Sequence, residues 1–301
     1  MTTTRDISSM PGYSLVEPLY SDNVTLVYRG IRQADGLAVA IKLLRREHPS
    51  FNEIANLRHE YAIALNLDFD GIVRPVALER YRNSYALVME DFGGISLQEY
   101  TQFSVLTLRE FIEIAIALCD ILHYLHQQRV IHKDIKPSNI LIHPETKHIK
   151  LTDFSIASLL PRETQAITNP ISGAWRGQHA LEGTLSYLSP EQTGRTNRGI
   201  DYRSDFYNLG VTLFELLAGE LPFQSNDPME LIHWHIAKMP PELGKGGVGE
   251  GIPGVLSDIV LKLMSKNAED RYQSALGLKY DLEICRQQLS SHATIFAHCK
   301  N

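Results

Sequence analysis

The feature that most constrains the fold is a change of pattern partway along the chain. The first part consists of short β-rich runs broken by turns, with one helical segment at 52–67 whose apolar residues recur at helical spacing. After the pair Gly93-Gly94, amphipathic helical runs dominate, beginning with 106–127. Strands followed by helices predict an α+β fold. We expect a small β-rich N-terminal lobe with one main helix and a larger, mostly α-helical C-terminal lobe.

The expected boundaries follow this change. They are a flexible leader at 1–12, a first lobe at 13–89, a linker or hinge at 90–95, a second lobe at 96–289 and a tail at 290–301. The expected strands are 13–17, 25–32, 37–43, 72–78 and 84–89, and the expected helices of the second lobe are 106–127, 204–217, 228–238, 257–266 and 274–289.

Composition narrows the class of protein. The chain has 301 residues, of which 44% are apolar, enough for a substantial core in two lobes. Its net charge of −6 does not suggest a nucleic-acid partner, and no apolar run is long enough to span a membrane. The three cysteines are widely spaced and odd in number, which argues against a disulfide framework or a zinc site. These features indicate a reduced, cytoplasmic, globular protein.

One short loop, Val130–Leu141, carries a carboxylate, an ammonium group and a carboxamide, at Asp134, Lys136 and Asn139. Metal-assisted phosphoryl transfer needs a base for the incoming hydroxyl, a cation for the moving phosphate and an oxygen ligand for Mg²⁺. Apolar residues on both sides can anchor the loop in a core. Taken alone, such a cluster is also compatible with a solvated turn, so its meaning depends on the rest of the chain.

Charged residues at the ends of two other apolar runs fit the same chemistry. Lys42 ends the run Val39–Lys42, and a lysine there is costly to bury without an anionic partner, such as a nucleotide phosphate or a carboxylate. Glu60 on the following helix is the favoured carboxylate, although Glu53 lies on the same helix. Asp153 ends the second run, and a hairpin can bring it near Asp134, so that one acid holds Mg²⁺ while the other orients the nucleophile.

An ordered set of motifs extends these observations. They are V-A-I-K at Val39–Lys42, H-K-D-x-K-x-x-N at His132–Asn139, D-F-S at Asp153–Ser155, G-T-x-x-Y-x-S-P-E at Gly183–Glu191, D-x-x-S-D-x-Y-x-L-G at Asp201–Gly210, and Arg271. With this set, residues 13–289 resemble the protein kinase family. The resemblance implies a two-lobed kinase fold and an ATP- and Mg²⁺-dependent transfer of the γ-phosphoryl group.

The resemblance also implies catalytic roles. Lys42 would hold the α- and β-phosphates and pair with Glu60, which the spacing to the next strand favours over Glu53. Asp134 would be the catalytic base, and Lys136 would contact the γ-phosphate.

Further roles concern the cofactors. Asn139 and Asp153 would be the Mg²⁺ ligands. The other residues expected at the ATP site are Val27, Ala40, Met89 as gatekeeper, Glu90 and Phe92 through backbone groups, and Leu141.

Other positions concern substrate type and scaffold. Thr184 and Lys136 match kinases that act on serine and threonine rather than tyrosine. Glu191 and Arg271 would form a buried ion pair, and Asp205 would brace the backbone of the catalytic loop.

The sequence also departs from the family pattern. Tyr20, Asp22 and Thr25 stand where the phosphate-covering loop has glycines, which let backbone N–H groups approach phosphates closely. We expect a looser clamp and weaker ATP binding, because the side chains must point away and an aspartate near phosphates is unfavourable unless it faces water. Ser155 replaces a glycine, and Lys133 replaces an arginine whose planar fork can grip a phosphate. Control by phosphorylation of the activation segment is therefore in question. Its candidate sites are Thr164, Thr168 and Ser172.

Three functions remain open from sequence. The leading one is an active serine/threonine kinase acting on proteins. The alternatives are a pseudokinase that binds nucleotide and regulates a partner, and a small-molecule kinase. The last does not explain Gly183–Glu191, a segment that the resemblance to protein kinases assigns to the peptide site. The segments Leu15–Gly30, Arg58–Tyr61 and Ser189–Arg195 are similar to the N-terminal kinase domain of large bacterial sensor proteins. That similarity implies ATPase-like and sensor histidine kinase regions as possible downstream partners.

Overall fold

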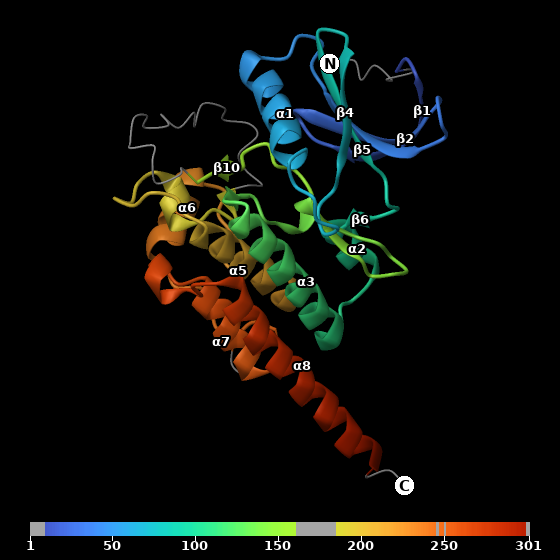
Figure 1. The fold of residues 1–301 in the computed structure, drawn as a ribbon. Coiled ribbons are helices and arrows are strands. Elements are labelled where there is room, and N and C mark those ends of the chain that lie inside the picture. The colour runs from blue at the N-terminus through green and yellow to red at the C-terminus, as the bar shows by residue number, and fades with distance from the viewer. Residues whose placement is uncertain (1–9, 161–184, 245–246, 250, 299–301) are drawn as a thin grey trace. The chain divides into compact units, whose positions relative to one another are not determined.

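The computed structural model describes residues 10–160, 185–244, 247–249 and 251–298, with side chains as far as residue 289. The chain divides into two compact units (Figure 1). As far as they are described, the first unit comprises Met1–Ile95 and Ile142–Ile156, and the second comprises Ser96–Leu141 and Ala157–Asn301.

The first unit is built on a five-stranded antiparallel sheet in the order β1-β2-β3-β5-β4. The strands are β1 (Tyr13–Ser21), β2 (Thr25–Arg32), β3 (Ala38–Leu44), β4 (Pro75–Tyr81) and β5 (Ser84–Glu90). Side chains alternate across a strand, so Val39, Ile41 and Leu43 of β3 share one face, where they are fully buried with Ala86 and Val88 of β5. The alternate residues of β3, including Lys42, therefore point to the opposite face.

Helix α1 (Phe51–Ala64) is the main helix of this unit and begins at a capping box. The Glu53 carboxylate accepts hydrogen bonds from Ser50 N at 2.6 Å and Ser50 Oγ at 2.7 Å, while Glu53 N donates to Ser50 Oγ. This reciprocal pattern satisfies orphan donors at the start of the helix. Glu53 is therefore committed to the cap, and the buried Glu60 is the acid of this helix that is left for Lys42.

A segment that follows the catalytic loop in sequence also belongs to the first unit. Strand β8 (Ile140–Ile142) pairs with β9 (Ile149–Leu151). Leu151 O accepts from Val73 N at 3.0 Å, and Leu151 N donates to Gly71 O at 2.8 Å. These backbone bonds fix the next residues, including Asp153, in the same unit as Lys42.

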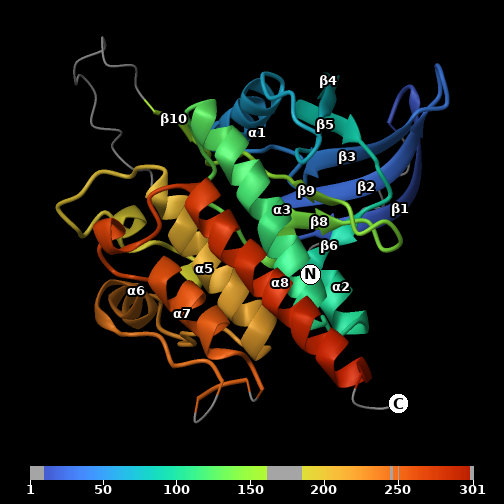
Figure 2. The ribbon, with the colours of Figure 1, turned by 60° about the horizontal axis from the view of Figure 1, so that its bottom comes forward.

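The second unit is mainly helical and holds the short strands β7 (Val130–Ile131) and β10 (Ser158–Leu159). Its helices are α2 (Leu97–Phe103), α3 (Leu108–Gln127), α5 (Arg203–Ala218), α6 (Pro228–Ala237), α7 (Gly254–Leu263) and α8 (Ala275–His298). Figure 2 shows α3, α5 and α8 side by side, and Lys279 of α8 donates to Asp120 of α3 at 2.6 Å. A β-sheet in one unit and helices in the other confirm the predicted α+β fold class.

Several elements differ from the sequence prediction, and β4 and α7 are each displaced by three residues from their expected bounds. Helix α2 was not predicted, because its seven residues bury only Leu97 and Tyr100 and show little periodicity. Helix α8 runs on to His298, through residues expected to form a tail. No described helix combines the length and the apolar character that crossing a bilayer requires.

Candidate active site

The first unit presents one sheet face that gathers the expected nucleotide residues. In the strand register, Lys42 lies opposite Val27 on β2 and Leu87 on β5, and Ala40 lies opposite Met89. Directly opposite residues share a face, as do residues two apart on one strand. All five side chains therefore belong to one face of the sheet.

Lys42 lies on this face between two carboxylates. Its Nζ is 2.8 Å from Glu60 Oε2 and 3.1 Å from Asp153 Oδ1, and its side chain is 9% exposed. Burial disfavours the charge on Lys42, but Asp153 and Glu60 outweigh it, and the pKa of Lys42 is raised. Burial raises the pKa of Glu60 to about 7, an effect that Lys42 opposes. Lys42 is therefore held as an ammonium group at neutral pH.

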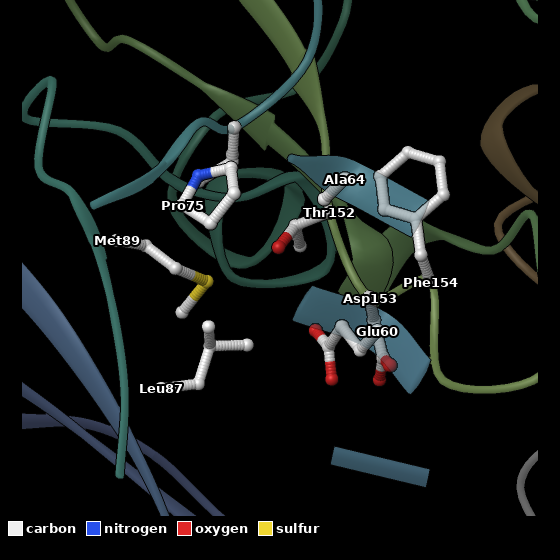
Figure 3. Close-up of a pocket in the computed structure, with 9 residues that line it drawn as sticks. Glu60, Ala64, Pro75, Leu87, Met89, Thr152, Asp153 and Phe154 are labelled. Carbon is white, nitrogen blue, oxygen red and sulfur yellow. The ribbon is translucent and has the colours of Figure 1, made fainter. Parts of the chain in front are cut away.

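A small pocket adjoins this charge cluster (Figure 3). The carboxylates of Glu60 and Asp153 point to the same side in this view, and Met89 and Leu87 of β5 lie across from them. The pocket is lined by Glu60, Ala64, Val73, Pro75, Leu87, Met89, Thr152, Asp153 and Phe154. Its wall is thus mostly apolar, with two acids at one side.

The expected hinge residues are fixed by a lysine that the sequence did not identify. The Glu90 carboxylate accepts from Lys150 Nζ at 2.6 Å, and Lys150 Nζ lies 5.3 Å from the centre of the Phe92 ring. Glu90 N donates to Arg74 O at 2.9 Å, so Glu90 offers no free backbone donor to adenine. Its carbonyl and the backbone of Phe92 remain the candidate groups.

In the second unit, the side chains of the catalytic loop converge on Asp134. Asp134 Oδ2 accepts from Lys136 Nζ at 2.8 Å and from Asn139 Nδ2 at 2.9 Å, and Asn139 Nδ2 also donates to Asp134 O at 2.8 Å. Asp134 Oδ1 is buried and has no hydrogen-bond partner among the described residues. The carboxylate is therefore oriented through one oxygen while the other can accept a proton. Leu141, two residues after Asn139, is half-buried between two buried isoleucines.

Asp205 of α5 braces the backbone of this loop, as the resemblance implied. Its fully buried carboxylate accepts from Lys133 N at 2.8 Å and from His132 N at 3.1 Å. It also bonds His126 Nε2 at 3.0 Å, a contact that the sequence did not predict because α3 and α5 lie far apart in the chain. Lys133 has a φ of 69°, a conformation that non-glycine residues rarely adopt. The brace therefore maintains a strained backbone next to Asp134.

Glu191 and Arg271 form the expected ion pair. Arg271 Nη1 lies 2.7 Å from Glu191 Oε1 and Nη2 lies 2.9 Å from Oε2, and both side chains are buried. Burial alone would raise the pKa of Glu191, but the Arg271 guanidinium and the Ser204 hydroxyl hold it below its usual value. The pair anchors the C-terminal end of the activation segment, residues 153–191.

The turn between β1 and β2 shows what replaces the missing glycines. Asp22 Oδ1 accepts from Val24 N at 2.7 Å and from Thr25 N at 2.6 Å, and Tyr20 Oη donates to Asp22 Oδ2 at 3.1 Å. This carboxylate therefore caps its own turn. Burial, followed by Asp22 and Asp153, raises the pKa of Tyr20 to about 12. Two backbone donors of the turn, one of them at a position where the family has a glycine, are thus already bonded.

The remaining positions stand as follows. Asp153 has a φ of 66°, and Ser155 N donates to Asp153 Oδ1 at 3.3 Å, so the backbone of Ser155 contacts the expected metal ligand. Thr184 and the candidate phosphorylation sites Thr164, Thr168 and Ser172 lie outside the described residues.

Comparisons with known proteins agree with this geometry. Residues 14–280 match the family model of the protein kinase domain. The chain therefore belongs to the protein kinase domain family, and the resemblance inferred from the motifs is confirmed.

Three similar proteins, two from bacteria and one from an amoeba, illustrate the range of the relatives. The serine/threonine-protein kinase PknB of Mycobacterium tuberculosis is 32% identical over 257 residues, which cover 81% of this chain and 38% of PknB. PrkC of Bacillus subtilis, also named a serine/threonine-protein kinase, is 34% identical over 249 residues, covering 81% of this chain and 36% of PrkC. The Hybrid signal transduction histidine kinase G of Dictyostelium discoideum is 35% identical over 248 residues, covering 63% of this chain and 7% of that protein. The chain thus spans well under half the length of these relatives.

Proposed function

We propose that this chain transfers the γ-phosphoryl group of Mg-ATP to serine and threonine hydroxyls of protein substrates in bacterial signalling. The observation that carries this proposal is the Asp134 carboxylate, which is oriented by Lys136 and Asn139 while its Oδ1 has no hydrogen-bond partner among the described residues. A base for an incoming hydroxyl needs both properties, a fixed orientation and a free acceptor. Relatives named serine/threonine-protein kinases support the choice of acceptor.

The donor set suits Mg²⁺, which prefers carboxylate and carbonyl oxygens. Asn139 uses its Nδ2 within the loop, so its Oδ1 can serve as a ligand, and the Asp153 carboxylate can serve as the other. The bound ion would neutralise charge on the β- and γ-phosphates.

Each residue then has one task in the transfer. Lys42, held by Glu60, binds the α- and β-phosphate oxygens. Asp134 orients the substrate hydroxyl and accepts its proton. Lys136, which lies 2.8 Å from Asp134, stabilises the charge on the transferred phosphoryl group. Val27, Ala40, Met89 and Leu141, with backbone groups of the hinge, would hold adenine.

The pseudokinase alternative rested on the missing glycines. The Asp22-capped turn bears on how firmly phosphates are held and removes no group that performs the transfer. We therefore infer weaker nucleotide binding in an active enzyme.

The wider setting is also a proposal. The similarity to a histidine kinase that is much longer than this chain supports a role beside sensor and ATPase-like regions. The dispersed cysteines support a reducing, cytoplasmic location, and Cys119 and Cys285 are both free and buried.

The test is a labelled-ATP assay with a generic basic protein as acceptor. Asp134→Asn should lower the rate of transfer about 10²- to 10⁴-fold, the range for loss of a general base. Asp258→Asn, at an exposed acid on α7, is the matched control and should retain the wild-type rate. A wild type that binds Mg-ATP but transfers nothing would overturn the proposal in favour of the pseudokinase.

A further inference from the structure

Gln192 connects two parts of the second unit that are far apart in sequence. It lies in the short 3-10 turn Pro190–Thr193 and is 7% exposed. Its Nε2 donates to Lys133 O at 2.8 Å, and its Oε1 accepts from Ser189 N and from Asn208 Nδ2, each at 3.0 Å. The amide orientation is fixed by this pattern, because the reversed amide would set a donor against two donors and an oxygen against a carbonyl.

The carbonyl that Gln192 holds belongs to the peptide group immediately before Asp134. The N–H of the same peptide group, Asp134 N, faces His132 Nδ1 at 3.3 Å. Gln192 supplies the shorter of these two bonds. Lys133 itself has a φ of 69°, so the backbone here needs outside support to keep its position.

Gln192 is also tied to the segment that precedes it. Asn208 of α5 donates through the same Nδ2 to Tyr187 O at 2.6 Å and to Gln192 Oε1. Tyr187 lies in the motif Gly183–Glu191, which the resemblance assigns to the peptide site. A continuous set of hydrogen bonds, buried at Asn208 and partly buried at Lys133, therefore runs from Tyr187 through Gln192 to the backbone next to Asp134.

We propose that Gln192 is a positioning residue, which sets the place of the Asp134 carboxylate relative to the segment that holds the acceptor peptide. The inference rests on the proposed kinase activity, because it assigns Gln192 a part in the same reaction. The hydrogen bonds of Gln192 connect the two segments without any phosphorylated residue. This matters because Lys133 lacks the planar fork with which an arginine would grip a phosphate.

The test uses two variants at one position. Gln192→Glu keeps an acceptor for Ser189 N and Asn208 Nδ2 but turns an oxygen toward Lys133 O, so it breaks only the bond to the catalytic loop. Gln192→Met removes all three bonds with little change in volume. Thr193→Val is the matched control, because Thr193 Oγ1 donates to Pro190 O at 2.6 Å in the same turn and does not reach the loop.

In steady-state transfer, Gln192→Glu should lower kcat about 10- to 100-fold, as expected when a reacting group is displaced by a fraction of an ångström to about 1 Å. The KM for ATP should stay within about twofold, because the nucleotide residues are untouched. The kcat deficit should shrink as the pH is lowered, since a protonated carboxyl can again donate to Lys133 O. Gln192→Met should lower kcat without this recovery, and Thr193→Val should keep the wild-type kcat.

Hydrogen exchange separates this inference from the proposed activity. In Gln192→Glu, amide exchange in a peptide spanning residues 130–141 should be faster than in the wild type and in Thr193→Val, whether or not the protein transfers phosphate. If the wild-type protein transferred no phosphate, the proposed function would be wrong, and the exchange result would still test the hydrogen bond between Gln192 and the loop. Wild-type kcat together with unchanged exchange in Gln192→Glu would overturn the positioning role.

Discussion

The β1–β2 turn and the catalytic loop both depart from the family pattern, and both are held by side chains that bond to backbone. In the turn, Asp22 accepts from Val24 N and Thr25 N, so its carboxylate occupies donors that face phosphates in the family. In the loop, Asp205 holds the N–H groups of His132 and Lys133, and Asp134 Oδ1 has no partner within the described part of the chain. In the turn a carboxylate occupies backbone donors, whereas in the loop a carboxylate braces the backbone beside Asp134.

The two regions also differ in burial. Asp205 is fully buried, and the neighbouring Glu191–Arg271 pair is almost fully buried, whereas the turn is half-exposed. Buried networks are costly to break, and exposed hydrogen bonds contribute little. We infer that the loop is rigid and that the turn can exchange its internal bonds for a ligand. In the proposed function, the residues assigned to the transfer are thus retained, and the turn assigned to the nucleotide phosphates is altered.

The largest effect on stability should come from breaking the buried ion pair between Glu191 and Arg271. Glu191→Gln leaves Arg271 without its charge partner and should lower the free energy of unfolding by about 3–5 kcal/mol. Asp22→Asn in the turn should change it by no more than about 1 kcal/mol. Urea denaturation measures both, and equal losses would break the contrast between a rigid loop and an adaptable turn.

Lys42 tests whether the first unit still grips phosphates despite the altered turn. Lys42→Met removes the cation between Glu60 and Asp153 and should lower kcat about 10²- to 10³-fold, the range for loss of one preorganised donor. Lys147→Met, at an exposed lysine of the same unit, is the control and should have no such effect. A Lys42→Met protein as active as the control would mean that other groups hold the phosphates.

Acid should weaken the unit that carries the loop. Burial lowers the pKa of His235 to about 3, with Lys266 adding to the shift. An unfolded histidine titrates near 6.5, so between pH 6.5 and 3 the unfolded chain binds a proton that the folded chain excludes. The free energy of unfolding should therefore fall as pH is lowered through this window, by at most about 1.4 kcal/mol per pH unit from this group. His235→Gln should have a shallower dependence, and an identical slope would contradict this origin.

Much of the fold was predictable because the spacing of apolar residues in the sequence indicates strands and helices. Strand β2 has its predicted bounds, and β3 and α3 are displaced by only one or two residues. The assignment of Ile142–Ile156 to the first unit was not predictable, since it depends on backbone pairing of Leu151 with Gly71 and Val73. The local sequence pattern does not indicate which distant residues pair.

The candidate site, like the fold, was predictable only in part. The contact of Lys42 with Glu60 was expected, and the capping box Ser50-x-x-Glu53 was a sequence signal that could have set Glu53 aside earlier. The cap formed by Asp22 also had a signal, because aspartate often bonds backbone N–H groups two residues ahead. His126, Lys150 and Gln192 had none, since each acts through a partner at least 59 residues away.

The smallest expected effect concerns the turn itself. Asp22→Gly frees the N–H groups of Val24 and Thr25 and removes a negative charge near the expected phosphates. The KM for ATP should fall about 5- to 10-fold, equivalent to about 1–1.4 kcal/mol, the order of one hydrogen bond. Asp22→Asn keeps an acceptor oxygen for the cap but loses the charge, so its KM should lie between those of the wild type and Asp22→Gly.

The central claim is that an intact catalytic loop works with an altered phosphate clamp. The most direct measurement is steady-state transfer at varied ATP concentration for the wild type, Asp22→Gly and Asp134→Asn, with nucleotide affinity measured by titration. We predict that Asp22→Gly lowers KM and keeps kcat, and that Asp134→Asn loses kcat and keeps its affinity for Mg-ATP. An unchanged KM in Asp22→Gly, or full transfer by Asp134→Asn, would contradict the account.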